Sequence, residues 1–152
     1  LYSYAFDGYW KDVGTIESLW QANMDLLQDQ LPFELNGDWK IYSSNPSMPP
    51  HYVGPDATVK NSMVSEGSMI LGDVENSVIF PGVRIGKGAK VRNSVIMPST
   101  VVRENAVVDY AILAQNCEIG EGAKVTGEKG AITVVADGET IVATAAGSKQ
   151  AG

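Results

Sequence analysis

The sequence has a single cysteine, Cys117, and a single histidine, His51. One cysteine excludes a disulfide framework within the chain and favours a reduced, cytoplasmic setting. One histidine excludes a three-histidine metal site within one chain, and its place in a proline-rich stretch leaves no histidine base on the repeats described below. We therefore expect His51 to be structural or solvated and Cys117 to be a small buried residue.

Basic residues and long apolar runs are also scarce. The chain has 11 Lys and Arg against 18 Asp and Glu, for a net charge of −7. This balance works against binding nucleic acid or an anionic membrane surface. No apolar run approaches the roughly 18 to 20 residues that span a bilayer, and the N-terminus lacks a signal-peptide pattern. Familiar glycine-rich phosphate loops are absent. We predict neither nucleic acid nor membrane as a partner.

Residues 1–30 predict a strand followed by a helix. The aromatic and aliphatic run from Leu1 to Phe6 is typical of a strand, and Asp7-Gly8 is typical of a turn. Thr15 is a candidate N-cap. The residues at helical spacing after it are Ile16, Leu19, Trp20, Asn23, Leu26 and Leu27. Because the chain starts inside the strand-like run, we expect a C-terminal fragment whose first element continues a larger domain.

Residues 31–56 predict an extended linker. The helical pattern ends near Leu31-Pro32, and prolines recur after it. They are Pro46, Pro49, Pro50 and Pro55.

Residues 57–125 contain a repeat with a period of 17 residues. Apolar residues recur in three registers, which are Ile85, Val102 and Ile119; Val91, Val108 and Val125; and Ile79, Ile96 and Leu113. The steps of six, five and six residues within a period indicate a three-sided coil, so we predict a parallel β-helix of hexapeptide repeats. Glycines suit turns with positive φ, and we place them at Gly86, Gly88, Gly120 and Gly122.

Both ends of such a stack expose strand edges that need cover. We expect the helix and linker to cover one end. At the other end, residues 126–152 predict a capping hairpin followed by a flexible tail, with Ile132 to Val135 and Thr140 to Val142 flanking the turn Asp137-Gly138.

The β-helix offers little chemistry of its own. Hexapeptide acyltransferases and γ-class carbonic anhydrases depend on histidines on the coils, and this repeat has none. The basic residues of the repeat allow an anion site on one outer face, although scattered solvated charges are the simpler interpretation. They are Arg84, Lys87, Lys90, Arg92 and Arg103.

The segment Tyr9 to Thr15 is a better candidate site. Asp12 lies between an aromatic pair and a glycine, directly before a capped helix. Such an aspartate caps a helix, shapes a turn or binds a metal, and spacing alone favours capping or a turn.

The run GYWKDVGTIESLWQANMDLL, with Trp39, Ile41-Tyr42-Ser43, Pro49-Pro50 and Asn-Ser-Val-Ile coils containing Met97-Pro98, closely resembles bacterial glucose-1-phosphate adenylyltransferase (ADP-glucose pyrophosphorylase). The resemblance covers about Leu1 to Val125. It implies a left-handed β-helix, preceded by the last strand and helix of an α/β nucleotidyltransferase domain over residues 1–30. The implied reaction joins ATP and glucose 1-phosphate into ADP-glucose and pyrophosphate for glycogen biosynthesis.

The same resemblance assigns roles to two residues. Asp12 would be catalytic, as one of the carboxylates that bind Mg²⁺, and Trp10 would wall the glucose site. Lys11 receives no role, while Gly14 and Thr15 would shape the turn and start the helix. The β-helix would serve oligomerisation, as a homotetramer or a heterotetramer with a homologous subunit, and allosteric regulation. The fragment alone is expected to be inactive.

Three alternatives stay open. A pyrophosphorylase for another sugar, such as mannose 1-phosphate with GTP, would share the motif. A non-catalytic regulatory subunit of the same family is disfavoured by the presence of Asp12. A hexapeptide acyltransferase is disfavoured by the missing coil histidines. Regulated members of the family use basic residues near the fourth coil and in the tail. Here Gln115 stands at one such place, and the tail has only two basic residues, Lys129 and Lys149, which argues against strong regulation by fructose 1,6-bisphosphate.

Overall fold

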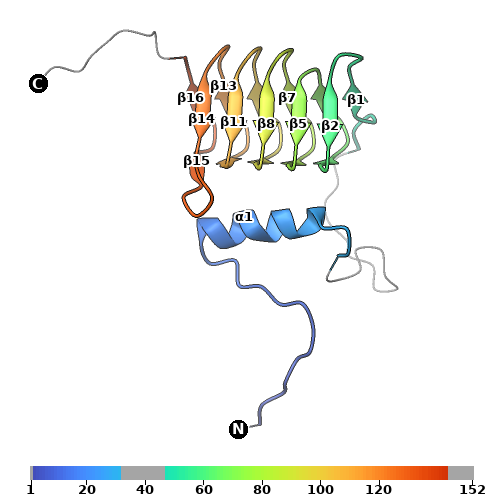
Figure 1. Ribbon diagram of the computed structural model, residues 1–152, viewed down its shortest axis with the longest axis vertical. Helices are drawn as coiled ribbons and strands as arrows, with labels where there is room; N and C mark the ends of the chain where they lie inside the picture. Colours follow the sequence, from blue (N-terminus) through green and yellow to red (C-terminus); the bar gives the residue numbers. More distant parts are fainter. Residues whose placement is uncertain (1, 32–46, 144–152) are drawn as a thin grey trace, which may run out of the picture.

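The computed structural model describes residues 2–31 and 47–143 (Figure 1). An N-terminal segment leads into helix α1 (Ile16–Met24), which continues as a 3-10 turn, η1 (Asp25–Leu27). The rest is a parallel β-helix. Most of the predicted linker and the end of the predicted tail lie outside the described residues.

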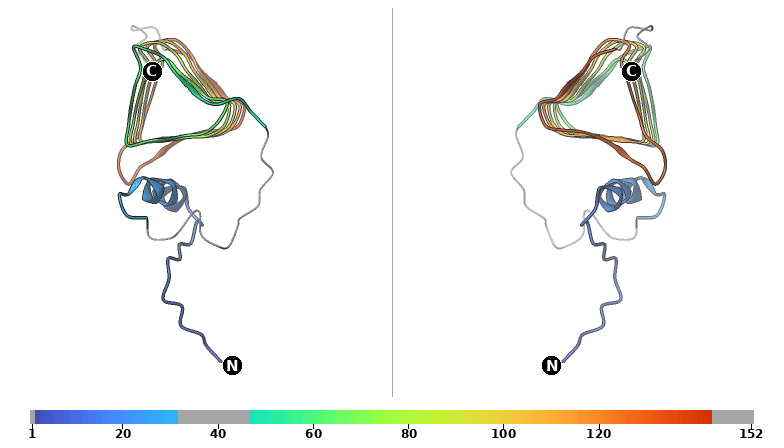
Figure 2. Two further views of the ribbon diagram at one scale, coloured as in Figure 1. Left: turned by 90° about the vertical axis from the view of Figure 1, so that its right-hand side faces the viewer. Right: turned by 90° about the vertical axis from the view of Figure 1, so that its left-hand side faces the viewer.

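Three parallel sheets form the sides of a triangular prism (Figure 2). Sheet A comprises β1 (Tyr52–Val53), β4 (Met69–Ile70), β7 (Arg84–Ile85), β10 (Val101–Val102), β13 (Glu118–Ile119) and β16 (Thr140–Ile141). Sheet B comprises β2 (Thr58–Lys60), β5 (Asp73–Glu75), β8 (Lys90–Arg92), β11 (Val107–Asp109) and β14 (Lys124–Thr126). Sheet C comprises β3 (Met63–Val64), β6 (Val78–Ile79), β9 (Val95–Ile96), β12 (Ala111–Leu113) and β15 (Thr133–Val135).

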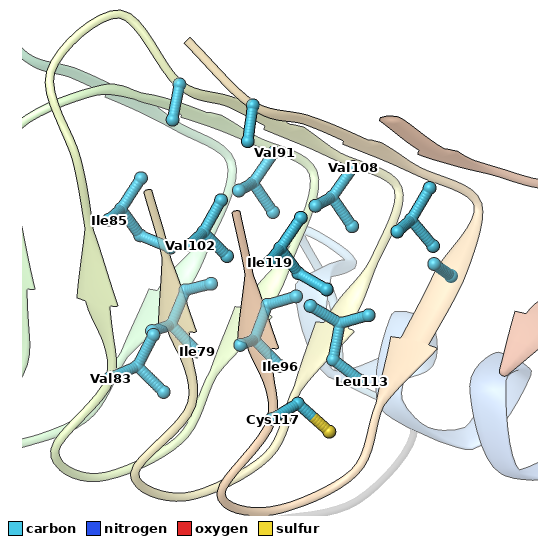
Figure 3. Close-up of a cluster of buried hydrophobic side chains, with 14 of the residues drawn as sticks. Ile79, Val83, Ile85, Val91, Ile96, Val102, Val108, Leu113, Cys117 and Ile119 are labelled. Atoms are coloured by element: carbon cyan, nitrogen blue, oxygen red, sulfur yellow. The ribbon is translucent and has the colours of Figure 1, made fainter. Parts of the chain in front are cut away.

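The 17-residue period predicts the strand register correctly. Its three apolar registers are three stacks inside the prism, one on each sheet (Figure 3). All nine of these side chains are at most 5% exposed. Because each sheet uses its inward positions in this way, the axis of the prism is an apolar column.

The β-helix extends further than predicted at both ends. It begins at β1, inside the predicted linker, and it continues to β16. The predicted hairpin is wrong, because β15 pairs in parallel with β12 and β16 pairs in parallel with β13. The spacing of apolar residues did not reveal this last coil, because a loop around the bridge Glu128↔Ala131 makes the coil longer than 17 residues. Gln115 and Asp137, which occupy equivalent positions, are consequently 22 residues apart, whereas the equivalent residues Asn76 and Asn93 of earlier coils are 17 apart.

The corners use glycine in two different ways. Gly88 and Gly122 have φ of 70° and 66°, which confirms the predicted left-handed turns. Gly86 and Gly120 were expected to do the same, but they are not among the residues with positive φ. A Cβ on Gly86 would lie 2.7 Å from the backbone nitrogen of Glu104, so close packing between coils requires glycine there.

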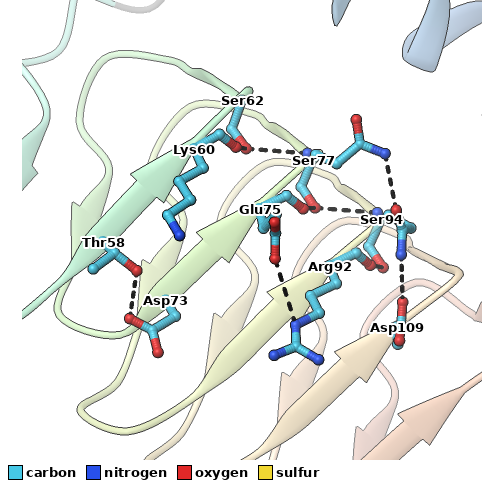
Figure 4. A network of polar contacts seen from close by, with 11 residues as sticks. Thr58, Lys60, Ser62, Asp73, Glu75, Ser77, Arg92, Ser94 and Asp109 are labelled. Atoms are coloured by element: carbon cyan, nitrogen blue, oxygen red, sulfur yellow. Dashed lines mark hydrogen bonds and ion pairs between the residues drawn. The ribbon is translucent and has the colours of Figure 1, made fainter.

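Asparagine and serine ladders line the corner between sheets B and C (Figure 4). The N–H of Ser77 donates to Ser62 Oγ, and the N–H of Ser94 donates to Ser77 Oγ, both at 3.1 Å. Asn76 and Asn93 have φ of 47° and 45°, a conformation that asparagine tolerates well. Asn76 Nδ2 donates to Asn93 Oδ1 at 2.8 Å. The repeated Asn-Ser pairs therefore tie successive coils together.

The strand expected at the N-terminus is not formed by residues 2–6, which have no regular secondary structure. Their aromatic side chains, Tyr2, Tyr4 and Phe6, are 64% exposed or more. A strand needs a neighbouring strand to satisfy its backbone hydrogen bonds, and the described part of this chain places none beside these residues.

Candidate functional site at the N-terminal segment

Thr15 starts helix α1, as predicted. Its Oγ1 accepts a hydrogen bond from the N–H of Ser18 at 3.1 Å, and its own N–H donates to Ser18 Oγ at 3.0 Å. This reciprocal capping box satisfies two backbone donors at the helix start. Asp12 is therefore not the helix cap, although spacing alone favoured that role or a turn.

Helix α1 lies along the outer face of sheet C, parallel to the direction in which the coils stack (Figures 1 and 2). Trp20 and Met24 are buried against the outward side chains of Val78, Val95 and Ile112. The expectation that the helix covers an end of the stack is wrong, because the apolar outer face of sheet C is the surface that it buries.

Trp20 is the main anchor of this contact. It is 5% exposed, and its Nε1 donates to the backbone oxygen of Asn93 at 2.7 Å. Its ring also packs on Tyr110 with centroids 5.8 Å apart. One polar and one aromatic contact thus fix the helix against two coils.

Replacement of Trp20 by phenylalanine should lower the free energy of unfolding by about 1 kcal/mol, because the aromatic packing stays while the Asn93 oxygen loses its donor. Chemical denaturation of the chain measures this loss. Trp10→Phe is the matched control, because Trp10 is 76% exposed and should tolerate the same substitution. Equal losses in the two variants would contradict the anchoring role of the indole N–H.

Trp10 and Asp12 lie in the segment directly before α1 and point their side chains to solvent, since both residues are exposed. The Asp12 carboxylate folds toward Gly14, where an added Cβ would lie 3.4 Å from Oδ1. No three His, Cys, Asp or Glu side chains come together as a metal centre within residues 2–31 and 47–143. Among these residues, Asp12 is an exposed carboxylate outside any such cluster.

Asp25 is a residue of this region that sequence reasoning missed. It is 6% exposed at the C-terminal end of α1. Oδ2 accepts hydrogen bonds from Tyr9 Oη at 2.9 Å and from Lys11 Nζ at 2.5 Å. Oδ1 accepts from Gln21 Nε2 at 3.0 Å and from Gln28 Nε2 at 3.2 Å. Lys11, which received no role from the sequence, therefore forms an ion pair with a buried carboxylate.

The hydrogen bonds around Asp25 set its protonation. Burial alone would raise its pKa, but the hydrogen bonds from Lys11, Gln21 and Tyr9 and the charge of Lys11 outweigh burial and lower the pKa. Burial and the contact with Asp25 raise the pKa of Tyr9. Because the folded state depresses the pKa of Asp25, this contact stabilises the fold above the ordinary aspartate pKa and is lost as the pH falls through the folded value.

The remaining candidates have structural roles or lie in solvent. His51 is exposed and Cys117 is 1% exposed, as expected. Cys117 Sγ donates to the backbone oxygen of Ala136 at 2.9 Å, and burial raises the pKa of its thiol. A buried thiol with a raised pKa is a poor nucleophile.

The basic residues of the repeat do not gather on one face. Arg84 is on sheet A, whereas Lys90 and Arg92 are on sheet B. Arg92 lies 3.8 Å from Glu75, and Arg103 Nε donates to Glu118 Oε1 at 2.8 Å. The single anion-binding face suggested by the sequence is therefore not formed.

Comparison with known proteins matches the two parts of the chain separately. The family described as "GlmU-like, C-terminal hexapeptide" matches residues 51–142, which include every strand of the β-helix from β1 to β16. The chain belongs to this hexapeptide family. The family described as "Nucleotidyl transferase" matches residues 1–29, which include the segment with Trp10 and Asp12. Within the hexapeptide family, the chain thus carries a nucleotidyltransferase-like N-terminal part.

Curated relatives confirm the resemblance seen in the sequence. A glucose-1-phosphate adenylyltransferase of Desulforamulus reducens is 44% identical over 151 residues, which cover 95% of this chain and 38% of that protein. A glucose-1-phosphate adenylyltransferase of Bacillus anthracis is 44% identical over 142 residues, which cover 91% of this chain and 38% of that protein. Another, from Clostridium novyi, is 58% identical over 90 residues, which cover 59% of this chain and 24% of that protein. The chain therefore spans well under half the length of the curated relatives that it matches. In the described residues, no helix has the length and apolar character needed to cross a membrane.

Proposed function

We propose that this chain works as the C-terminal part of a glucose-1-phosphate adenylyltransferase, which forms ADP-glucose and pyrophosphate from ATP and glucose 1-phosphate for glycogen biosynthesis. The observation that carries the proposal is the exposed pair Trp10 and Asp12, held directly before a capped helix within a region similar to enzymes of that name. The nucleotide would be bound by a catalytic domain beyond this chain, in the cytoplasm.

In this proposal, Asp12 supplies one oxygen ligand to Mg²⁺. A carboxylate suits this role, because Mg²⁺ prefers oxygen ligands and commonly binds one or two carboxylates together with substrate phosphates. Asp12 is exposed and is not needed by the helix cap. Bound Mg²⁺ would neutralise charge on the phosphates during transfer. The other protein ligand would come from the catalytic domain.

Trp10 would form one wall of the glucose site. Its indole is 76% exposed, and Tyr2, Tyr4 and Phe6 of the same segment are also exposed. Several exposed apolar side chains close together mark a binding site or a contact with another domain. A flat aromatic surface next to Asp12 would hold the sugar ring while its phosphate meets the metal.

The β-helix would serve oligomerisation and allosteric regulation, in a homotetramer or with a homologous subunit. Its three faces differ in the surfaces they offer. α1 covers sheet C. Sheet B carries a row of side chains whose charge alternates in sign from one strand to the next, namely Lys60, Glu75, Arg92 and Asp109. Sheet A keeps Tyr52 and Met69 exposed, at 53% and 40%, and is the face that we assign to a second copy.

The test measures ADP-glucose and pyrophosphate formation with Mg²⁺. The full-length protein that contains this chain should form both products, whereas the 152-residue chain alone should form neither because it holds only part of the site. GTP with mannose 1-phosphate should be a poor substrate pair. Product formation by the 152-residue chain alone, or preference for another sugar phosphate, would overturn the proposal.

A further inference from the structure

Asp25 connects two parts of the molecule through its two carboxylate oxygens. Oδ1 accepts hydrogen bonds from Gln21 and Gln28, which belong to the end of the helix. Oδ2 accepts hydrogen bonds from Tyr9 and Lys11, which belong to the segment before the helix. One buried side chain thus joins the end of the helix to the chain that precedes it.

The two partners in that segment alternate with the two proposed site residues. Tyr9 and Lys11 direct their polar ends to Asp25, although Tyr9 is 37% exposed and the Lys11 side chain is 26% exposed. Trp10 and Asp12 are exposed. Neighbouring side chains of an extended backbone point to opposite sides, so anchoring Tyr9 and Lys11 on Asp25 would direct Trp10 and Asp12 away from it.

The segment has little other regular support. Residues 2–14 form no helix or strand, so no hydrogen-bonded ladder fixes their backbone. Asp25 is 6% exposed, and burying a carboxylate destabilises a fold unless the carboxylate is paired and hydrogen-bonded. Its four donors meet that need while fixing the segment.

We propose that Asp25 is a positioning residue for the transfer reaction, because it holds Tyr9 and Lys11 so that Trp10 and Asp12 face the sugar phosphate and Mg²⁺. This inference rests on the function proposed above. Asp25 touches neither substrate nor metal, and it acts through the segment. Lys11 is its main partner, because its ammonium group forms an ion pair with the carboxylate.

The first experiment follows chymotrypsin cleavage after Tyr9 and Trp10 in the 152-residue chain. Asp25→Asn should accelerate this cleavage by about tenfold, because loss of the charged contact makes local opening of the segment easier, while the coils stay resistant. Asp29→Asn is the matched control, since Asp29 is exposed four residues further along the chain. An unchanged cleavage rate would overturn the holding role.

The second experiment measures steady-state kinetics of the full-length enzyme as Mg²⁺ is varied. Asp25→Asn should lower kcat and raise the half-saturating Mg²⁺ concentration by about tenfold, the size found when a group supporting a metal ligand is removed. Lys11→Met should act in the same direction, and the double variant should show less than the sum of the two effects. Asp29→Asn should match the wild type.

The readouts separate the possible failures. A lower thermal midpoint with unchanged Mg²⁺ dependence would show a purely structural role and overturn the inference. If Asp25→Asn fails to fold, Lys11→Met provides the same measurement. A wild-type protein that forms no ADP-glucose would overturn the proposed function, and with it the positioning role, while the cleavage experiment would still decide whether Asp25 holds the segment.

Discussion

Replacement of Asp12 by asparagine should lower kcat of the full-length enzyme by about a hundredfold, equivalent to about 2.7 kcal/mol of transition-state stabilisation. The amide keeps the shape of the side chain but is a much weaker ligand for Mg²⁺ than a carboxylate. Asp12 is exposed and does not cap α1, so the fold should be unaffected. Initial rates at saturating ATP and glucose 1-phosphate measure the loss.

Asp7→Asn provides a control for this result. It makes the same chemical change at another exposed aspartate of the same segment, and it should keep wild-type kcat. A loss below about tenfold for Asp12→Asn, equivalent to about 1.4 kcal/mol, would reject the metal-ligand role. An equal loss in both variants would point to a general effect of charge on the segment.

Replacement of Leu113 by alanine should lower the free energy of unfolding by about 3 kcal/mol. Leu113 is fully buried and stacks between Ile96 and Val135 of the adjoining coils. The smaller side chain loses apolar contacts and leaves a cavity that the stacked strands cannot close. Because each coil contacts only its neighbours, the change weakens two coil interfaces together. Chemical denaturation of the 152-residue chain measures the loss.

Val134→Ala tests whether burial is responsible. Val134 lies on the next strand of the same sheet, points outward and is 45% exposed. Its truncation should change the free energy of unfolding by about 0.5 kcal/mol or less. Comparable losses at the two positions would contradict the description of Leu113 as part of a closely packed stack.

The coils were predictable because one physical requirement recurs in each of them. Every side of the prism needs an inward apolar residue at the same height, so Ile85, Val102 and Ile119 reveal their pairing through spacing alone. The last coil escaped this reasoning. Its extra loop around Glu128 and Ala131 breaks the spacing, and the remaining strands then resemble a local hairpin around Asp137-Gly138.

The position of α1 was not predictable from its own sequence. The amphipathic pattern identifies the apolar side of the helix, but it does not say which surface that side meets. The outward residues of sheet C, such as Val78 and Val95, are apolar in a strand that is also apolar inside. Such runs indicate a sheet buried on both faces, a signal that would have placed the helix on a side.

The candidate site also has residues that the sequence identified and one that it did not. A motif brought attention to Trp10 and Asp12, and the structure places both in solvent beside the helix start. Asp25 gave no such signal, because its partners Tyr9 and Lys11 are 16 and 14 residues away without any periodic relation. An aspartate at the end of a helix is an ordinary exposed residue until the tertiary contacts are known.

The packing of α1 on sheet C also decides the position of the helix along the direction in which the coils stack. One helical turn advances about 5.4 Å and neighbouring strands are about 4.8 Å apart, so a helix sliding by one coil would meet nearly equivalent apolar positions. One corner position breaks this equivalence. Asn61, Asn76 and Asn93 precede Tyr110 in that row, and all four have positive φ. In this row only the tyrosine offers Trp20 a ring, so the contact between the two rings distinguishes the observed position of α1 from positions one coil away.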